Sequence, residues 1–518
     1  MLSSRAFRAR GATHLDGREL LVGEILRRAA ESVPDAPAAA MDDAELSYAE
    51  LDRAASRMAL AMRDALGVRK GDRIVLWADT ALDVVPLFVA VAKLGAVFAP
   101  LNARLGAEEA GEVGALARGT LLIVDEARQE EAQTVAVAAG IKRCALLSGA
   151  PIAGAEIVGL DYRDLPDPEM PITEPALVET DPHVIFFTSG STGRPKGVVL
   201  SHRANWLRGF QGVFLSEPER TVCMFPLFHM AAFTLAIAAW HTRGEICFTQ
   251  PTAKALLDAV ERRRANRLYG LPLIFSRILD EDTSKWDLSS LKKIDTGTSA
   301  TPIELVRRIK DRFPEPALGI YYGSTEVGLA ACLVDGDVLR KPGSVGPASI
   351  SADLRLAEDG EICVRSPFLM EGYFDDPEAT SAALQDGWFA TGDLGALDED
   401  GYLSVVGRKK EILRTGGESV SPSEVEGVLR DAPGVEEVAI VGLPDADWGE
   451  VLCAAVVPKE GAVITLAELR DHCEGRLAGF KKPRRLALLD SLPRTAATSQ
   501  VQRSLLVEQI QDQGLAKE

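Results

Sequence analysis

The stretch Thr188-Ser189-Gly190-Ser191-Thr192-Gly193-Arg194-Pro195-Lys196-Gly197 follows four apolar residues, 184–187, that have the pattern of a buried strand. Glycine tolerates positive φ angles, so three glycines within these ten residues allow several backbone amides to turn toward one anion. The serine and threonine hydroxyls add donors, and Lys196 adds a positive charge. The stretch therefore predicts a loop that holds a polyphosphate at the end of a strand.

This loop differs from the P-loop of the common nucleoside triphosphatases. The P-loop needs Gly-x-x-x-x-Gly-Lys-Ser/Thr, and the hydroxyl after the lysine binds magnesium. Here Lys196 is followed by Gly197. Because runs of serine, threonine and glycine are also common in polar surface loops, the loop taken alone leaves both interpretations open.

Helical and strand patterns alternate along most of the chain. Residues 47–50 have the spacing of a capping box ahead of a helix, and residues 73–77 read as a buried strand. A further helical stretch and the apolar residues 96–100 follow. This alternation predicts the α/β fold class with a largely parallel sheet.

A different pattern begins after about residue 408. Ser421-Pro422-Ser423-Glu424 combines a serine N-cap, a proline at the first helical position and a glutamate at the third. Two strand patterns, at 435–443 and 451–457, and a second capped helix at 465–468 follow. We therefore expect two domains, residues 1–408 and a small α+β domain of residues 409–518.

Composition limits the class of protein and its partners. The 518 residues exceed one ordinary domain core, and 47% hydrophobic with 26% charged residues is typical of a soluble protein. A net charge of −19 argues against nucleic acid as the main partner. Seven cysteines without metal-binding spacing favour reduced thiols in a cytoplasmic protein. Since no apolar run reaches about 18 residues, we expect no membrane span.

Several further strings follow the loop. They are Tyr322-Gly323-Ser324-Thr325-Glu326, Thr391-Gly392-Asp393, Gly407-Arg408-Lys409-Lys410-Glu411, Gly416-Gly417-Glu418 and Leu492-Pro493-Arg494-Thr495. With the loop, they resemble the adenylate-forming superfamily, which contains acyl-CoA synthetases, peptide-synthetase adenylation domains and firefly-type luciferases. The resemblance runs from about Leu46 to about Arg503 and points to the branch of acyl-CoA synthetases, or AMP-dependent CoA ligases.

The resemblance implies a fold and a two-step reaction. The fold has a large N-terminal domain with mixed sheets in several subdomains and a small, mobile α+β C-terminal domain. A carboxylic acid, possibly a fatty acid, attacks the α-phosphate of ATP, and the acyl-adenylate then passes its acyl group to coenzyme A. The implied cofactors are ATP, Mg²⁺ and coenzyme A, and the resemblance also suggests a homodimer.

The resemblance also assigns roles to single residues. Glu326 would hold the magnesium ion, a role that suits a hard carboxylate oxygen. Thr325 would donate to the α-phosphate, Tyr322 would stack on adenine, and Asp393 with Arg408 would hold the ribose. Thr188 and Lys196 join the catalytic set. The remaining nucleotide-binding residues implied are Ser189, Gly190, Ser191, Thr192, Gly193, Gly297, Thr298, Ser299 and Gly323.

The acyl side is less defined by the sequence. His229 matches a family position between the nucleotide and the acyl pocket, although a core histidine with one hydrogen bond fits the residue equally. Phe233, Trp240 and residues 269–272 are candidates for an acyl tunnel, and such an apolar pattern is also typical of a core. Fatty, branched and aromatic acids therefore all remain open.

Other matched positions concern the second step. The resemblance makes Lys410 the pivot of the small domain and places Gly416 and Gly417 along the thiol path, where a hairpin turn is the alternative. The basic run 481–485 is either a site for CoA phosphates or solvated surface.

One position departs from the family. Gln500 stands where the adenylation lysine is expected, and it keeps hydrogen-bond donors but loses the positive charge. Loss of one oriented transition-state contact typically slows a reaction by about 10²- to 10³-fold. Three interpretations compete: adenylation that is slow but sufficient or supported by another cation, a substitution introduced to trap a complex, and loss of the first half-reaction.

Rival functions share most of the matched strings. An adenylation-deficient relative would transfer acyl groups from supplied acyl-AMP, or would bind nucleotide without turnover. A luciferase-like oxygenase would emit light or consume oxygen. The presence of Lys196, Glu326, Asp393 and Arg408 weighs against a simple binding protein.

Overall fold

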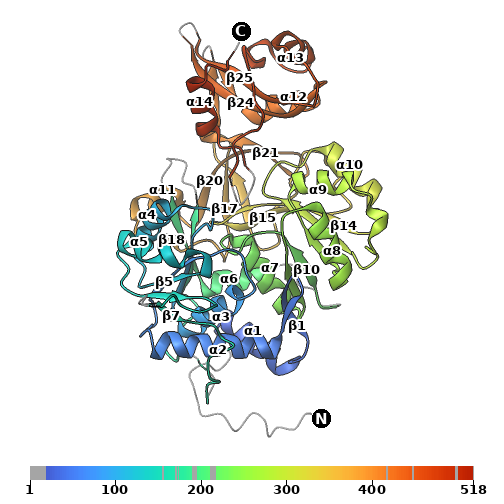
Figure 1. Ribbon diagram of the computed structural model, residues 1–518. Helices are drawn as coiled ribbons and strands as arrows, with labels where there is room; N and C mark the ends of the chain where they lie inside the picture. The colour runs from blue at the N-terminus through green and yellow to red at the C-terminus, as the bar shows by residue number, and fades with distance from the viewer. Residues whose placement is uncertain are drawn as a thin grey trace.

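The computed structural model describes residues 19–516, except 154–156, 170–171, 173, 189–194, 211–216, 416–417, 446–447 and 496–499. Figure 1 shows a large body and a small domain, drawn in orange and red, that stands on one end of it above β20 and β21. The large body contains two eight-stranded sheets and a smaller one, and the small domain has its own three-stranded sheet. The mixed α/β fold with a large N-terminal and a small C-terminal domain is confirmed.

The first large sheet carries the ends of the predicted phosphate loop. Its order is β18-β9-β8-β4-β3-β5-β6-β7, parallel from β8 to β7 and antiparallel at β8–β9 and β9–β18. Its strands are β3 (Arg73–Trp77), β4 (Val97–Pro100), β5 (Leu121–Val124), β6 (Cys144–Leu146), β7 (Ile157–Gly159), β8 (Pro182–Thr188), β9 (Lys196–Ser201) and β18 (Gly372–Tyr373). The helices near it in sequence are α2 (Tyr48–Asp64), α3 (Val84–Leu94), α4 (Ala107–Leu116), α5 (Gln129–Ala139) and α6 (His202–Phe210). The predicted capping box at Ser47 and Glu50 is present at the start of α2.

The second large sheet has the order β15-β14-β13-β12-β10-β11-β1-β2, with antiparallel pairs at its two edges. Its strands are β1 (Pro37–Met41), β2 (Ala44–Ser47), β10 (Arg220–Cys223), β11 (Glu245–Phe248), β12 (Arg267–Tyr269), β13 (Lys293–Gly297), β14 (Ala317–Ser324) and β15 (Gly328–Leu333). The associated helices are α1 (Val22–Ser32), α7 (Met230–His241), α8 (Ala253–Arg263), α9 (Pro272–Asp280) and α10 (Ile303–Arg312). One apolar core joins the two large sheets, because it includes Phe98 and Phe186 from the first and Val222 and Ile294 from the second.

The third sheet links the large body to the small domain. It contains β16 (Asp353–Leu356), β17 (Glu361–Arg365), β19 (Leu384–Gln385), β20 (Trp388–Leu397) and β21 (Leu403–Arg408), with α11 (Pro377–Ala383) beside it. The small domain contains β22 (Leu413–Thr415), β23 (Glu418–Val420), α12 (Pro422–Leu429), β24 (Val435–Asp445), β25 (Gly449–Pro458), α13 (Leu466–His472), β26 (Arg485–Leu488) and α14 (Arg503–Asp512). Two apolar clusters of this domain contain no residue before Leu413. The boundary at residues 408/409 stays our proposal, and it coincides with the end of β21.

One cap prediction in the small domain is wrong. Ser421 precedes α12, but its side chain does not cap the helix. The Ser421 and Ser423 hydroxyls instead donate to the carbonyl of Val406 in β21, at 2.7 and 2.6 Å. A local N-cap bond is thus replaced by contacts that hold the start of α12 against the third sheet. The second predicted capping box, at Thr465 and Glu468, is present.

Among the described residues, no helix is both long and apolar enough to cross a membrane.

Candidate active site

The two residues that frame the predicted phosphate loop are neighbours in space. Thr188 at the end of β8 and Lys196 at the start of β9 are register partners in an antiparallel pair. The chain therefore leaves and re-enters the first sheet at one point. The predictions for Ser189, Gly190, Ser191, Thr192 and Gly193 lie outside the described residues.

A tyrosine that sequence reasoning missed connects this loop to Glu326. The Lys196 ammonium lies 4.4 Å from the centre of the Tyr373 ring, and the Tyr373 hydroxyl donates to Glu326 Oε1 at 3.4 Å. Tyr373 lies in β18, which pairs with β9. The loop lysine and the predicted metal-binding carboxylate are thus separated by a single side chain. The short edge strand that places Tyr373 there carries no motif of its own.

Glu326 lies in the tight connection between β14 and β15. Its Oε2 accepts a hydrogen bond from the Ser324 hydroxyl at 2.8 Å, and the Glu326 backbone amide donates to the Ser324 Oγ at 3.3 Å. A Cβ atom at Gly323 would stand 1.9 Å from the carbonyl oxygen of Gly328, so only glycine fits there. Gly323 is therefore needed to bring the two strands together, which places Thr325 and Glu326 at the site.

Asp393, Arg408 and Tyr322 form one polar group at the junction of the domains. Asp393 and Arg408 are register partners in β20 and β21, and the Arg408 Nε lies 3.1 Å from Asp393 Oδ1. The Tyr322 hydroxyl donates to Asp393 Oδ2 at 2.8 Å. Burial raises the pKa of Asp393, and the Arg408 charge opposes that rise. Burial and the neighbouring Asp393 also raise the pKa of Tyr322, so its hydroxyl remains a donor.

The small domain reaches this site through Gln500. The Gln500 side-chain amide donates to the carbonyl oxygen of Thr298 at 3.2 Å. Thr298 has a φ of +63°, and the preceding Gly297 would place a Cβ 2.3 Å from the Tyr321 carbonyl oxygen. The 297–298 loop, followed by the exposed Ser299, therefore forms the part of the large domain that position 500 contacts.

His229 is the N-cap residue of α7 and lies beside a row of aromatic rings. Its Nδ1 accepts a hydrogen bond from the Ala231 amide at 3.2 Å, and burial lowers its pKa to about 4, so the ring is neutral at pH 7. The ring stacks on Phe225 with centroids 5.3 Å apart, and Phe225 meets Tyr269 at 5.2 Å. Tyr269 in turn lies 6.1 Å from Tyr321. One hydrogen bond and an apolar packing partner agree with a structural histidine, and the gating role stays a prediction.

The structure corrects two residues of the predicted acyl tunnel. Phe233 stacks on Phe88 with centroids 4.1 Å apart, in the core between the two large sheets. The Trp240 indole is buried and donates to the carbonyl of Ala38 at 3.1 Å. Their apolar spacing on α7 therefore serves packing. Tyr269, by contrast, lies next to Gly297, since its hydroxyl would stand 3.1 Å from a Cβ atom there.

The predicted pivot region joins β21 to the small domain. Lys410 lies in a short 3₁₀ helix, Lys409–Glu411, in which the Lys409 ammonium contacts Asp359 at 2.5 Å and Glu361 at 2.8 Å. Gly416 and Gly417 lie outside the described residues. In the basic run 481–485, the Arg484 guanidinium lies 3.8 Å from the centre of the Trp448 ring.

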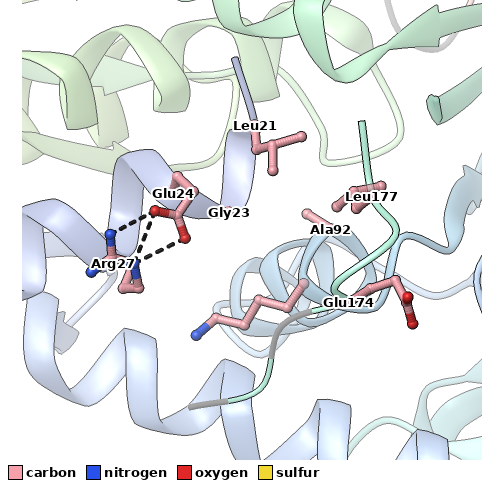
Figure 2. Close-up of a pocket in the computed structure, with 8 residues that line it drawn as sticks. Leu21, Gly23, Glu24, Arg27, Ala92, Glu174 and Leu177 are labelled. Atoms are coloured by element: carbon pink, nitrogen blue, oxygen red, sulfur yellow. Dashed lines mark hydrogen bonds and ion pairs between the residues drawn. The ribbon is translucent and has the colours of Figure 1, made fainter. Parts of the chain in front are cut away.

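A small cavity lies apart from all these residues. It has a volume of about 20 Å³, which holds about one water molecule, and it lies between α1 and α3 (Figure 2). The residues that line it are Leu21, Gly23, Glu24, Arg27, Ala92, Lys93, Glu174 and Leu177. The Glu24–Arg27 ion pair in its wall is 2.6 Å long. This cavity is too small for the acid, and we regard it as a packing defect.

Comparisons with known proteins identify the family to which the chain belongs. Residues 26–374 match the family model of the AMP-binding enzyme, and residues 424–498 match that of the AMP-binding enzyme C-terminal domain. The chain is 36% identical over 489 residues to a feruloyl-CoA synthase of an Amycolatopsis species, covering 91% of this chain and 95% of the relative. It is 31% identical over 512 residues to a long-chain-fatty-acid–CoA ligase of Mycobacterium tuberculosis, covering 94% and 98%.

A solved structure has a similar fold over most of the chain. The o-succinylbenzoate CoA synthetase of Bacillus subtilis, in complex with its acyl-adenylate intermediate, superposes with a TM-score of 0.81 at 26% identity. The match covers 93% of this chain and 97% of that chain. With two family models that together span most of the sequence, these matches show that the chain belongs to the AMP-binding enzyme family, in the acyl-CoA synthetase branch of the adenylate-forming superfamily.

Proposed function

We propose that the protein is an AMP-forming acid–CoA ligase. The acid carboxylate attacks the α-phosphate of ATP, pyrophosphate leaves, and the thiol of coenzyme A then displaces AMP from the acyl-adenylate. The observation that carries this proposal is the meeting of Lys196, Glu326 and Asp393 with Gln500 from the other domain in one site. No observation favours the alternative of a nucleotide-binding protein without turnover.

Each polar group of the site has a task in the first step. The carboxylate and the triphosphate are both anions, so they meet only where oriented donors and cations offset their charge. The Lys196 charge and the amides of the loop serve the β- and γ-phosphates, which become pyrophosphate. The Asp393 carboxylate, held by Arg408 and Tyr322, accepts hydrogen bonds from the ribose hydroxyls. Binding the nucleotide at both ends fixes its α-phosphate.

Glu326 fits a magnesium ion that arrives with ATP. Mg²⁺ is usually held by one or two carboxylates together with substrate phosphates and several waters. The Glu326 carboxylate is partly exposed, and its two contacts are to hydroxyl donors, Ser324 and Tyr373. A bound Mg²⁺ would supply charge neutralisation to the phosphates. The Ser324 hydroxyl restrains the carboxylate through its hydrogen bond to Oε2.

Gln500 lies where an attacking carboxylate is expected, but it supplies only an amide. In the structure this amide donates to the Thr298 carbonyl, so it must turn away from that partner to meet a substrate oxygen. Because the positive charge is missing, we expect the first step to be slow by about 10²- to 10³-fold relative to a lysine enzyme. The second step involves neither pyrophosphate nor a carboxylate nucleophile, so it does not depend on that charge.

The small domain offers a place for the nucleotide part of coenzyme A. Trp448 is 39% exposed, and Arg484 lies over its ring. An exposed indole beside a guanidinium fits a stacked base and its phosphates. Lys481 and Lys482 are on the same segment and pair with Glu424 and Glu474. We assign this surface to coenzyme A. For the basic run 481–485, we therefore propose a site for CoA phosphates and not merely a solvated surface.

The acid that best fits the site is a compact aromatic acid. Tyr269 and Tyr321 lie beside Gly297, and the Tyr269 hydroxyl has no hydrogen-bond partner among the described residues. The same sheet face carries Arg267 and Asp295; Arg267 binds Asp295 at 2.5 Å and Glu219 at 2.9 Å, and Asp295 is fully buried. A long alkyl chain along this face would leave the Tyr269 hydroxyl without a hydrogen-bond partner, which is costly. A short ring with a hydroxyl or similar group meets aromatic faces and the free Tyr269 hydroxyl instead.

A panel of acids tests the proposal. Hydroxycinnamate, cinnamate, octanoate and palmitate are each incubated with ATP, Mg²⁺ and coenzyme A, and AMP and CoA-thioester are measured. We expect hydroxycinnamate to give the largest kcat/KM and palmitate the smallest. A preference for palmitate would contradict the aromatic assignment, whereas absence of thioester with every acid would contradict the ligase function itself.

Two further expectations stay predictions. The sequence favours a cytoplasmic protein, and the resemblance implies a homodimer. Light scattering on the purified chain measures the second directly, and a mass of 55.5 kDa would identify a monomer.

A further inference from the structure

A buried arginine lies directly behind the Thr325–Glu326 turn. Arg208, near the end of α6, is only 4% exposed. Its guanidinium donates to the carbonyl oxygens of Thr325 at 2.8 Å and Glu326 at 3.0 Å. It also donates twice to the carbonyl oxygen of Phe368, at 3.0 and 2.8 Å. None of the sequence motifs includes this residue.

The three acceptors are backbone atoms of the two segments that carry active-site side chains. The first segment bears Thr325 and Glu326. The second begins at Phe368 and leads to Met370, whose amide donates to the Glu326 carbonyl at 2.8 Å, and then to Tyr373. Arg208 therefore fixes the position of Glu326 relative to Tyr373, the residue that its carboxylate contacts.

The surroundings of Arg208 are shaped to admit a charged guanidinium. Gly328 has a φ of +69°, and a Cβ atom there would stand 3.1 Å from Arg208 Nε. Within the described part of the chain, no carboxylate oxygen forms an ion pair with Arg208. Burial lowers its pKa to about 9, which still leaves it protonated at pH 7. Burying a cation with carbonyl partners alone is costly, so packing alone gives no reason for it.

Geometry also explains why arginine is present here. A planar guanidinium with five donors in a fixed fork can reach three carbonyls at once, whereas a lysine ammonium is a compact charge on a flexible stem. The proposal that follows rests on the proposed ligase function. We infer that Arg208 is a positioning residue for adenylation: its hydrogen bonds to the carbonyl oxygens of Thr325, Glu326 and Phe368 hold the turn that bears Glu326 in place.

The test separates the two half-reactions. Arg208→Met and Arg208→Lys are compared with the wild type and with Arg203→Met. Arg203 is on the same helix, 47% exposed, and pairs with Glu179 at 3.2 Å, so it is a matched surface control. The readouts are ATP binding by calorimetry with and without Mg²⁺, pyrophosphate exchange, and thioester formation from supplied acyl-adenylate.

Arg208→Met should lose pyrophosphate exchange by about 10²-fold, the usual effect of removing an oriented electrostatic contact. Mg²⁺ should tighten ATP binding less in this variant than in the wild type, while thioester formation from acyl-adenylate stays close to the wild-type rate. Arg208→Lys, which keeps the charge but not the fork, should fall between the two, and Arg203→Met should match the wild type.

An unchanged effect of Mg²⁺ on ATP binding in Arg208→Lys would overturn the inference. A parallel loss of both half-reactions in that variant would also overturn it, because it would show a purely structural role. If Arg208→Met does not fold, the same measurements on Arg208→Lys alone test the inference. Failure of the wild type to ligate any acid would instead contradict the proposed function.

Discussion

The nucleotide end and the acyl end of the site are built in different ways. At the nucleotide end, the functional residues lie at strand ends and in tight connections, and strand pairing sets their spacing. Thr188 faces Lys196 in one pair, and Asp393 faces Arg408 in another. At the acyl end, Tyr269 and Tyr321 lie on one face of the second sheet, which they share with the Arg267–Asp295 ion pair. The nucleotide end is thus specified mainly by strand pairing and tight turns, and the acyl end mainly by the side chains that one sheet face carries.

This difference has a consequence for substitution. Residues held by strand pairing and glycine-dependent turns have little freedom to move, so changes at the nucleotide end should abolish the first step. Side chains on a sheet face are replaced at lower cost, so changes at the acyl end should redirect the choice of acid. The predictions below test this contrast, in order of decreasing effect.

Glu326→Gln should give the largest effect. The change removes the carboxylate charge while keeping its shape, and we expect pyrophosphate exchange to fall by about 10³-fold. Thioester formation from supplied acyl-adenylate should persist, because pyrophosphate takes no part in that step. Glu217→Gln, which changes an exposed carboxylate that pairs with Lys292, is the matched control. Equal losses in both variants would contradict a special role for Glu326.

Gln500→Lys should give the next largest effect, and in the opposite direction. Restoring the charge should raise pyrophosphate exchange by about 10²-fold and leave the second half-reaction unchanged. Stopped assays of the two half-reactions check this. An exchange rate equal to that of the wild type would show that position 500 does not act in adenylation, despite its contact with Thr298.

Tyr269→Phe tests the acyl end. The substitution removes the Tyr269 hydroxyl. The ratio of kcat/KM for hydroxycinnamate to kcat/KM for cinnamate should therefore fall roughly 10-fold, as expected when one hydrogen bond to a substrate group is lost. Tyr162→Phe serves as control, because Tyr162 lies near Arg57 and outside the site. A preference that does not change would place the substrate hydroxyl elsewhere.

Acid sensitivity is the smallest expected effect. Burial lowers the pKa of His202, His229 and His241 to about 4. Between the unfolded value of about 6.5 and the folded value, the unfolded chain binds more protons, so stability is lost as the pH falls through this window. The thermal unfolding midpoint should decline steadily from pH 6.5 toward pH 4. A midpoint that does not decline would show that these histidines accept protons in the native state.

Sequence reasoning reached the nucleotide end more fully than the acyl end. Glu326, Asp393 and Arg408 each lie within a short sequence motif, so the residues next to them in the sequence are enough to identify them. Tyr373 and Arg208 were missed because an edge strand and a helix bring them to Glu326 from distant parts of the chain. The assignment of Phe233 and Trp240 to the acyl tunnel was wrong, because the apolar spacing of a helix does not show whether its apolar side lines a pocket or packs in the core. The Arg267–Asp295 pair depends on the register of β12 and β13, which sequence alone does not fix.

The product balance of the complete reaction tests the central claim most directly. Wild-type protein is incubated with hydroxycinnamate, ATP, Mg²⁺ and coenzyme A, and nucleotides and thioester are quantified together. A shared site that adenylates and then transfers predicts AMP and thioester in equal amounts, with AMP formation dependent on the acid. ADP in place of AMP, or AMP formed without added acid, would contradict it.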